Sequence, residues 1–496
     1  MAELELLSVR AALVSLFGIV LSLWIVQRKR ALGYLQTFGI PCPPSHFVYG
    51  NLHQLRWSKD KNVLEMQQEW LDRYGKIVGY YMGLKPRIIV ADLDAAKRIL
   101  VKDINIFTNR PDVPRGLPTL LSLRDQRWKD IRHILTPTFS SLKLKLMMPL
   151  VGQCVDEMMD ILQEKSCNVL DIYETFQGLT LDVISRCALA LRLDCQGNPN
   201  HEILVAVRNL FRLDLSRIVV LLVCFPGLRA VFRMLFRFAP SHKLIKFVLG
   251  HLKSVIQQRR NQKEDPVLVD ALHLLLEASE GDRKGPALLN DDEIIWNAYV
   301  FLLAGYETTS TALSYVCHCL SLHPDVQERI FEELKSLERP LKYEDMAELR
   351  YLELVILESM RLYPPVPLFV SRECKETVTI DDLTIPEGST VDVPVWCIHR
   401  DPELWPDPLT FDPYRHSNEM KADRHPMAFL PFGSGPRNCI GARFAMLEMK
   451  MALARLLRQF RVLPCSQTQD PLPTVVRTTI MNPLDGVWVK LEPRVQ

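Results

Sequence analysis

The chain has 496 residues, of which 48% are hydrophobic, as is ordinary for a globular protein. Its 60 Lys and Arg residues nearly balance 58 Asp and Glu residues, and this net charge of +2 argues against nucleic-acid binding. Twelve cysteines without paired or metal-finger spacing indicate free thiols in a reducing compartment. No linker, repeat or low-complexity tract divides the sequence, so we expect one large core.

The N-terminal segment is predicted to be a membrane anchor. From Leu6 to Val26 the only charged residue is Arg10, and this stretch is long enough to span a bilayer. A basic cluster, Arg28 to Arg30, follows at once and should keep the downstream body in the cytosol. A cleaved signal peptide would carry its positive charge before the apolar run. We therefore expect an uncleaved transmembrane anchor over residues 1–30, with a signal peptide or a buried core helix as the alternatives.

The segment after the anchor is predicted to be stiff. Pro41, Pro43 and Pro44 exclude a helix and indicate a hinge between the anchor and the body. The pattern then predicts a helix over residues 62–73 and a pair of strands between residues 76 and 92. Helical periodicity dominates the rest of the chain.

Trp128 and Arg132 lie four residues apart, and hence on one face of a predicted helix. A half-buried tryptophan packed against a surface arginine is the structural explanation of such a pair. Lys129, Lys143 and Lys145 form either a basic face that receives a partner protein or an ordinary solvated face. The sequence gives these two interpretations equal weight.

A second apolar stretch runs over residues 218–238. Pro226 and Gly227 interrupt it, and three arginines lie within it, so it does not resemble a membrane span. We expect a surface lid that dips into the membrane and admits substrates from the lipid. An ordinary buried helix pair is the alternative.

The apolar pattern over residues 290–323, which begins with an asparagine cap, predicts a helix of about 50 Å that crosses the whole molecule. Gly305 costs about 1 kcal/mol against alanine inside a helix, so we expect that it provides needed space. Thr308 can bond back to the carbonyl of Ala304 and open the helix locally, and Glu307 beside it can relay protons from solvent. A threonine that caps a kink and a glutamate in a core salt bridge are the structural alternative.

Residues 350–363 form a predicted amphipathic helix that Pro364 and Pro365 stop. Glu358 and Arg361 lie three residues apart in it, so their side chains can pair. Alone this spacing is a weak signal, because it is common on exposed helices.

The most informative segment is FGSGPRNCIG, from Phe432 to Gly441. Its glycines and proline predict a tight loop, and helical periodicity begins directly after it, so Cys439 should lie at a helix N-terminus that favours its thiolate. Gly441 would let the helix approach a flat ligand, with Phe432 beneath it and Arg437 within reach of a carboxylate at its edge. Haem is such a ligand.

The full pattern FxxGxRxCxG is present, with Phe432, Gly435, Arg437, Cys439 and Gly441 in place. It resembles the cysteine-ligand loop of the cytochrome P450 superfamily, and the whole chain from residue 31 looks most like its microsomal animal members of the family-3 type. The resemblance implies a mainly α fold with small β-sheets and haem b bound by the Cys439 thiolate. It also implies a catalytic domain over residues 31–496, anchored to the endoplasmic reticulum and facing the cytosol.

The same resemblance suggests roles for residues around the haem. Trp128 and Arg132 are implied to bind a haem propionate, and Arg110 and Arg372 are weaker candidates for that role. Glu358 and Arg361 are implied to lock the core beneath the haem together with Arg415 of the FDPYRH segment. Here Tyr414 and His416 replace the acid and the aromatic residue of the usual PERF pattern, which leaves the local packing open.

The implied reaction inserts one oxygen atom of O2 into lipophilic small molecules, with NADPH electrons from cytochrome P450 reductase and with cytochrome b5 as a further partner. Glu307 and Thr308, beside Ala304, would supply the two protons that oxygen activation requires, and Gly305 would leave room for dioxygen over the iron. An endoperoxide isomerase of the thromboxane-synthase kind would not need the Thr308 alcohol, and a non-catalytic haem protein would show a degraded relay. The sequence has no glycine-rich segment of the kind that binds phosphates, so we expect no flavin or nicotinamide site in this chain.

Five segments are candidate walls of the substrate pocket, and their Leu, Val, Phe and Met content predicts apolar substrates. They are residues 110–121, the predicted lid, and residues 298–308, 365–370 and 475–481.

Overall fold

The computed structural model describes residues 2–58, 61–111, 117–165, 168–213, 238–261, 270–280, 289–337, 341–477 and 479–494, with residues 220, 223–225, 227 and 234. The helices are α1 (Ala2–Leu32), α2 (Leu52–Trp57), α3 (Val63–Tyr74), α4 (Leu93–Lys97), α5 (Asp125–Leu135), α6 (Ser141–Glu164), α7 (Ile172–Leu189), α8 (Glu202–Arg212), α11 (Pro240–Asn261), α12 (Ala271–Glu280), α13 (Asp291–Leu322), α14 (Pro324–Lys335), α15 (Asp345–Glu348), α16 (Arg350–Leu362), α17 (Val395–Ile398), α18 (Asn418–Ala422) and α19 (Ala442–Gln459). Short 3-10 or π turns are η1 (Leu35–Phe38), η2 (Arg98–Lys102), η3 (Thr136–Phe139) and η5 (Pro413–His416). The strands are β1 (Ile77–Met82), β2 (Lys85–Val90), β3 (Val169–Asp171), β4 (Ser371–Glu373), β5 (Val378–Ile380), β6 (Leu383–Ile385), β7 (Thr390–Asp392), β8 (Phe460–Leu463), β9 (Thr474–Val476), β10 (Met481–Pro483) and β11 (Trp488–Pro493).

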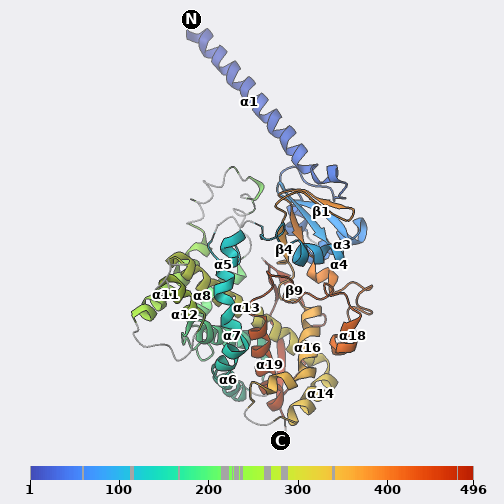
Figure 1. Ribbon diagram of the computed structural model, residues 1–496. Helices are drawn as coiled ribbons and strands as arrows, with labels where there is room; N and C mark the ends of the chain where they lie inside the picture. Colours follow the sequence, from blue (N-terminus) through green and yellow to red (C-terminus); the bar gives the residue numbers. More distant parts are fainter. Residues whose placement is uncertain are drawn as a thin grey trace.

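Helix α1 projects away from the body, with the N-terminus at its far end (Figure 1). Its apolar side chains, such as Leu13, Val14 and Phe17, are exposed. The stretch Arg10–Phe38 is long and apolar enough to cross a membrane, and its most apolar window is not covered by the rest of the protein. This helix is the candidate membrane anchor.

The anchor helix is fixed to the body by Arg28, which is only 2% exposed. Its guanidinium donates hydrogen bonds to the main-chain carbonyls of Phe47, Val48 and Cys224. The next two basic residues are exposed, so only the first residue of the predicted basic cluster is part of the body.

The predicted proline hinge is not present, because the segment packs on the sheet. The Gly79 N–H in β1 donates to the Pro41 carbonyl at 2.8 Å, and Ile40 is buried. A Cβ on Gly79 would lie 2.7 Å from the Cys42 sulfur, which shows how closely the two segments approach. The segment of Pro41, Pro43 and Pro44 is therefore packed against the body instead of forming a free hinge.

The sheet beside the anchor has four strands in the order β1-β2-β7-β4. Strands β1 and β2 pair antiparallel, with Ile77 opposite Val90, as the sequence predicts. Strands β2 and β7 pair in parallel although they are far apart in the chain. The other sheets are β3-β11-β8, β10-β9 and β5-β6, so the fold is mainly helical with small β-sheets, as predicted.

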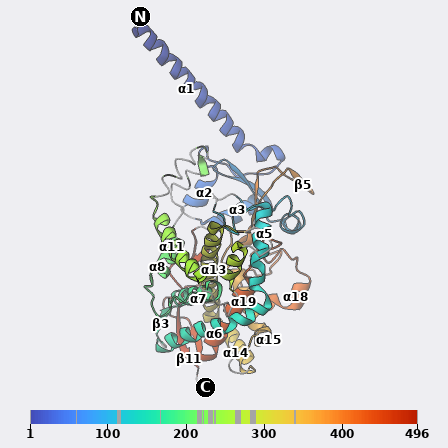
Figure 2. The same cartoon turned by 60° about the vertical axis from the view of Figure 1, so that its left-hand side comes forward.

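Helix α13 passes through the centre of the helical part, with α7, α11 and α19 packed around it (Figures 1 and 2). Its start is closed by the predicted cap: the Glu293 N–H donates to the Asn290 side chain at 2.9 Å, and the Asn290 N–H donates to the Glu293 carboxylate at 3.1 Å. The predicted helix over residues 290–323 is thus confirmed. Most of its residues are buried, which explains its almost uniformly apolar sequence.

Most of the predicted lid, residues 218–238, lies outside the described residues, as do residues 112–116 and 478 of the expected pocket walls. Within the lid segment, Val220 and Cys224 are buried beside Leu52, whereas Phe238 is 77% exposed. The described part of this segment thus contacts the body close to the place where Arg28 fixes the anchor.

Candidate active site

The cysteine loop is a tight turn that leads into α19. Gly435 has a φ of 72°, and a Cβ on it would lie 1.9 Å from the Leu100 carbonyl oxygen, so only glycine fits there. The Cys439 N–H donates to the Phe432 carbonyl at 2.9 Å and closes the loop, and Gly441 is the N-cap of α19. Cys439 is exposed, whereas the other described cysteines, all of them free thiols, are buried or half-buried.

The electrostatics of Cys439 differ from the prediction that the helix start favours its thiolate. The surrounding protein removes water from the Cys439 sulfur, and this desolvation raises the pKa of the thiol. The Gly441 N–H and the charges of Arg132 and Arg110 oppose the shift.

Four arginines from distant parts of the sequence lie together near Cys439, and we call them the arginine cluster: Arg110, Arg132, Arg372 and Arg437. Arg110 donates to the main-chain carbonyl of Arg437 at 3.3 Å. Arg132 donates to both the main-chain and the side-chain oxygen of Asn438 at 2.9 Å. Arg437 donates to the carbonyls of Thr108 and Leu123, at 2.9 and 2.8 Å. These bonds join the cysteine loop to the segments that carry Arg110 and Arg132.

Within the described residues, no ion pair joins the arginine cluster to a carboxylate. The Nε atoms of Arg110 and Arg372 are buried and have no hydrogen-bond partner. Burial lowers the pKa of Arg372 to about 10, and burial together with the neighbouring guanidinium charges lowers that of Arg437 to about 9. The cluster therefore fits an anionic group, such as the two propionate carboxylates of a haem.

Trp128 lies directly beside the arginine cluster. It is 4% exposed, and the guanidinium carbon of Arg437 lies 4.0 Å from the centroid of its ring. The arginine over the Trp128 ring is thus Arg437 and not Arg132, which instead binds Asn438. Both members of the predicted pair therefore contact the cysteine loop: Trp128 packs against Arg437, and Arg132 binds Asn438.

Two residues at the centre of α13 are accessible. Ala304 is exposed and Thr308 is half-buried, although most of the helix is buried. The Thr308 hydroxyl donates to the Ala304 carbonyl at 2.7 Å, which is the predicted hydrogen bond. Phe139 connects this helix to α19, because its ring centroid lies 5.9 Å from that of Phe301 and 6.1 Å from that of Phe444. The middle of α13 therefore carries an alcohol that is partly accessible.

Gly305 has a different role from the one expected. A Cβ on it would lie 2.6 Å from Cγ1 and 2.7 Å from Cδ1 of Ile184 in α7. The glycine thus allows α13 and α7 to approach closely, and the expectation that it keeps space free for dioxygen is corrected.

Glu307 also differs from the prediction, because it is only 1% exposed and does not contact solvent as a relay would. Its carboxylate accepts hydrogen bonds from Tyr173 of α7 and Asn482 of β10, and a longer one of 3.4 Å from Gln177. Burial raises the pKa of Glu307, against the effect of these three donors. The residues that hold it were missed because they lie far away in the sequence and match no motif.

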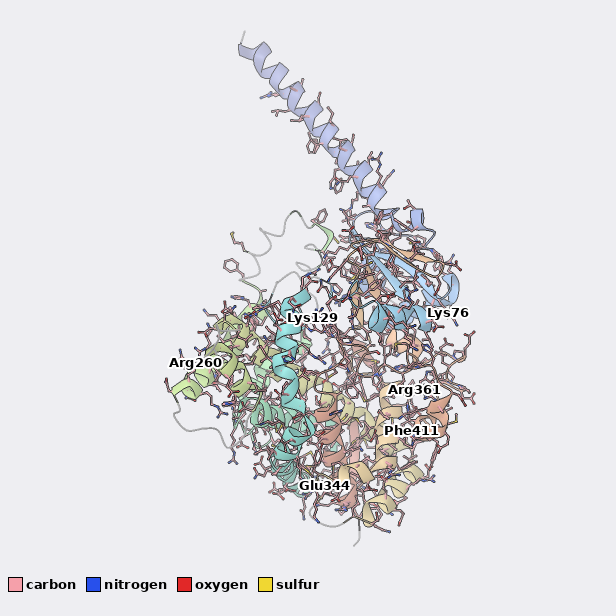
Figure 3. All side chains as sticks on the ribbon, in the orientation of Figure 1. Lys76, Lys129, Arg260, Glu344, Arg361 and Phe411 are labelled. Carbon is pink, nitrogen blue, oxygen red and sulfur yellow. The ribbon has the colours of Figure 1, made fainter. Side chains whose placement is uncertain are left out.

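Glu358 and Arg361 form the predicted pair, and both are fully buried in α16. Figure 3 labels Arg361. Two hydrogen bonds of 2.8 Å join them, from Nε to Oε2 and from Nη2 to Oε1. Burial alone would raise the pKa of Glu358, but the bonds from Arg361 and His416 hold it below its ordinary value. The expected third partner, Arg415, is only within ion-pair distance, with its Nε 3.6 Å from Oε1.

The family pattern for Cytochrome P450 matches residues 40–487, which is most of the chain. The chain belongs to the cytochrome P450 family. It is 34% identical to Cytochrome P450 3A29 of Sus scrofa over 473 residues, which is 93% of each chain. It is 36% identical to Cytochrome P450 3A31 of Mesocricetus auratus over 92% of this chain and 91% of the relative, and 33% identical to Cytochrome P450 3A28 of Bos taurus over 93% and 92%.

The cytochrome P450 family binds haem b through a cysteine thiolate, so this is the cofactor of the chain. Membership also establishes a monooxygenase that uses O2, lipophilic substrates and redox partners. The exposed cysteine would suit the iron of that cofactor, and the arginine cluster, which has no acidic partner among the described residues, would suit its propionates.

Proposed function

We propose that the chain inserts one oxygen atom of O2 into lipophilic small molecules, with electrons from NADPH that reach it through cytochrome P450 reductase. Residues 1–30 serve as a transmembrane anchor, and residues 31–496 form the catalytic domain on the cytosolic side of the endoplasmic reticulum. The exposed apolar surface of α1 and the exposed basic residues Lys29 and Arg30 support this placement.

Cys439 is proposed as the axial ligand, since it is exposed at the start of α19 in a loop that only glycine at position 435 permits. Cys439 would hold the haem as its thiolate, and the haem would supply the oxygen chemistry. Arg110, Arg132, Arg372 and Arg437 hold the propionate edge, with Trp128 behind Arg437. Phe432, half-buried beneath the loop, supports the flat face.

Thr308 is proposed to hold and deliver protons through its hydroxyl. Its bond to the Ala304 carbonyl fixes the oxygen on the accessible side of α13, and it can release that bond to a water molecule. Glu307 lies in a different network, in which its carboxylate accepts hydrogen bonds from Tyr173 and Asn482, so it is not proposed to pass protons directly to Thr308. This position of the alcohol is the observation that favours a monooxygenase, because an endoperoxide isomerase does not need delivered protons.

The experiment compares Thr308→Ala with Thr308→Ser, which keeps the alcohol. In bilayer discs with reductase and a panel of lipophilic compounds, Thr308→Ala should lower product formed per NADPH by about tenfold or more and release peroxide instead. Thr308→Ser should stay close to the wild type. Equal coupling in all three proteins would contradict the proposed role of Thr308.

Two other functions predict different results in the same assay. An endoperoxide isomerase would form product without NADPH and would not respond to Thr308→Ala. A non-catalytic haem protein would bind the compounds without consuming NADPH.

A redox partner is expected to approach the side of the cysteine loop. Lys129 is exposed on α5 (Figure 3), and Lys143 is half-buried on α6. Lys145 instead forms an ion pair with Glu344, so it belongs to an intramolecular contact. Substitution of Lys129 by Glu should slow electron transfer from the reductase or from cytochrome b5 and reduce its dependence on salt.

A further inference from the structure

The hydrogen bonds at Glu358 show a feature that the sequence motif does not predict. Oε2 lies 3.0 Å from Nε2 of His416, and both side chains are fully buried. The Asp412 N–H donates to Oε1 at 3.1 Å. Arg415, in contrast, donates from Nη2 to the Asp407 carbonyl at 3.0 Å, and its Nε has no hydrogen-bond partner.

The local backbone explains why one residue faces the carboxylate and its neighbour does not. Residues 413–416 form the 3-10 turn η5, whose start is capped by the Asp412 side chain, which accepts the Tyr414 N–H at 3.0 Å. Successive side chains in such a turn point about 120° apart. With His416 directed at Glu358, Arg415 reaches only the edge of the carboxylate.

His416 also connects this pair to the segment that carries the cysteine loop. Its ring centroid lies 4.5 Å from that of Phe429 and 5.6 Å from that of Trp405. Next to Phe429, the Leu430 N–H donates to Nε2 of His399 at 2.9 Å. Phe432, three residues after Phe429, accepts the Cys439 N–H.

Arg361 reaches the same segment by a second route. Its Nη1 donates to the His399 carbonyl at 2.8 Å, and His399 in turn accepts the Leu430 N–H. The carboxylate of Glu358 therefore holds two groups, Arg361 and His416, that both brace the chain just before Cys439.

We propose that His416, in place of Arg415, is the third hydrogen-bonding partner of Glu358, and that it positions the segment Phe429–Phe432 that leads to the cysteine ligand. The proposal rests on Cys439 as the haem ligand. His416 acts through other residues, so it is a positioning residue. An aromatic side chain at 416 could supply the packing on Phe429, but only a donor can supply the bond to Glu358.

The test measures the reduced, carbon-monoxide-bound spectrum of the full-length protein in bilayer discs at increasing urea. Loss of the strongly red-shifted Soret band reports loss of thiolate ligation and requires no turnover, so it is independent of the coupling result at Thr308. His416→Phe should increase the fraction without thiolate by about tenfold at a fixed urea concentration, because the bond to a charged group is lost. His416→Gln, which keeps an N–H donor, should recover part of that loss.

Arg415→Met is the matched control on the adjacent residue. It should change the same fraction by less than about threefold, because Arg415 makes no hydrogen bond to Glu358. In the His416→Phe background Arg415 can move onto Glu358, so Arg415→Met should then cost more than it does in the wild type. If Arg415→Met alone disrupts the thiolate spectrum as strongly as Glu358→Gln, Arg415 is the third partner and the proposal is wrong. The comparison of Arg415→Met with Glu358→Gln tests the proposal even if His416→Phe fails to fold. Equal spectra of His416→Gln and His416→Phe would show that the ring packs without a necessary hydrogen bond, which also overturns the proposal.

Discussion

The close approach of α13 and α7 leads to a prediction for Gly305→Ala. The new methyl group would lie 2.6 Å from Cγ1 and 2.7 Å from Cδ1 of Ile184, closer than carbon atoms pack, so either the side chain or a helix must move. Overpacking of this kind costs about 1–3 kcal/mol. Alanine regains about 1 kcal/mol of helix propensity, so we expect a net loss of about 0–2 kcal/mol in the free energy of unfolding.

A double-mutant cycle separates packing from a role in oxygen chemistry. Ile184→Ala removes the two closest atoms, although its Cβ stays 3.0 Å from the new methyl group, and it leaves a gap that the methyl group introduced by Gly305→Ala can partly fill. Gly305→Ala should therefore be neutral or stabilising in that background, with an interaction energy of about 1–3 kcal/mol. The assay is urea unfolding followed by the haem spectrum in all four proteins. An equal cost of Gly305→Ala in both backgrounds would refute the packing explanation. If Gly305→Ala instead left the free energy of unfolding unchanged and increased peroxide release, the expectation that Gly305 leaves room for dioxygen would be restored.

Three further results are expected. Arg28→Gln should speed amide hydrogen exchange in residues 47–52 and 223–225 by about tenfold, because their carbonyls lose a charged donor, whereas Lys29→Gln, which keeps the neighbouring arginine, should not. Glu448 is fully buried, neither carboxylate oxygen has a hydrogen-bond partner, and burial raises its pKa, so its stabilising contribution is complete at low pH and is lost as pH rises. In thermal unfolding, as pH rises above the ordinary pKa of a glutamate, the wild type should lose up to about 1.4 kcal/mol per pH unit relative to Glu448→Gln. Glu307→Gln should lower product per NADPH much less than Thr308→Ala, and a similar loss would show that the acid does act as a relay.

The features that sequence predicted well depend on neighbours along the chain. The Asn290 cap, the bond from Thr308 to Ala304 and the pair of Glu358 and Arg361 each join residues within one helical turn, so spacing alone specifies them. The strand pair β1 and β2 was found for the same reason, because a short turn joins it. The cysteine loop was specified by glycines whose backbone conformation few other residues can adopt.

The features that sequence missed depend on contacts between distant segments. Glu307 was assigned to solvent because its partners Tyr173 and Asn482 lie 134 and 175 residues away. Arg28 was grouped with two exposed basic residues because nothing local distinguishes it, although its third partner is Cys224. In each case a charged or polar group is buried by a partner that only the fold brings near, and periodicity carries no information about such partners.

The arginine cluster shows why the cofactor and the fold must be considered together. Bringing several guanidinium groups close to one another and out of water is unfavourable, and the lowered pKa values of Arg372 and Arg437 record that cost. Bonds to main-chain carbonyls orient these side chains but do not neutralise their charge. Two carboxylates would do so, and would also satisfy the buried Nε atoms of Arg110 and Arg372. The same groups that make the cluster costly on its own would therefore make haem binding strong, so that insertion of the cofactor contributes to the stability of the folded chain.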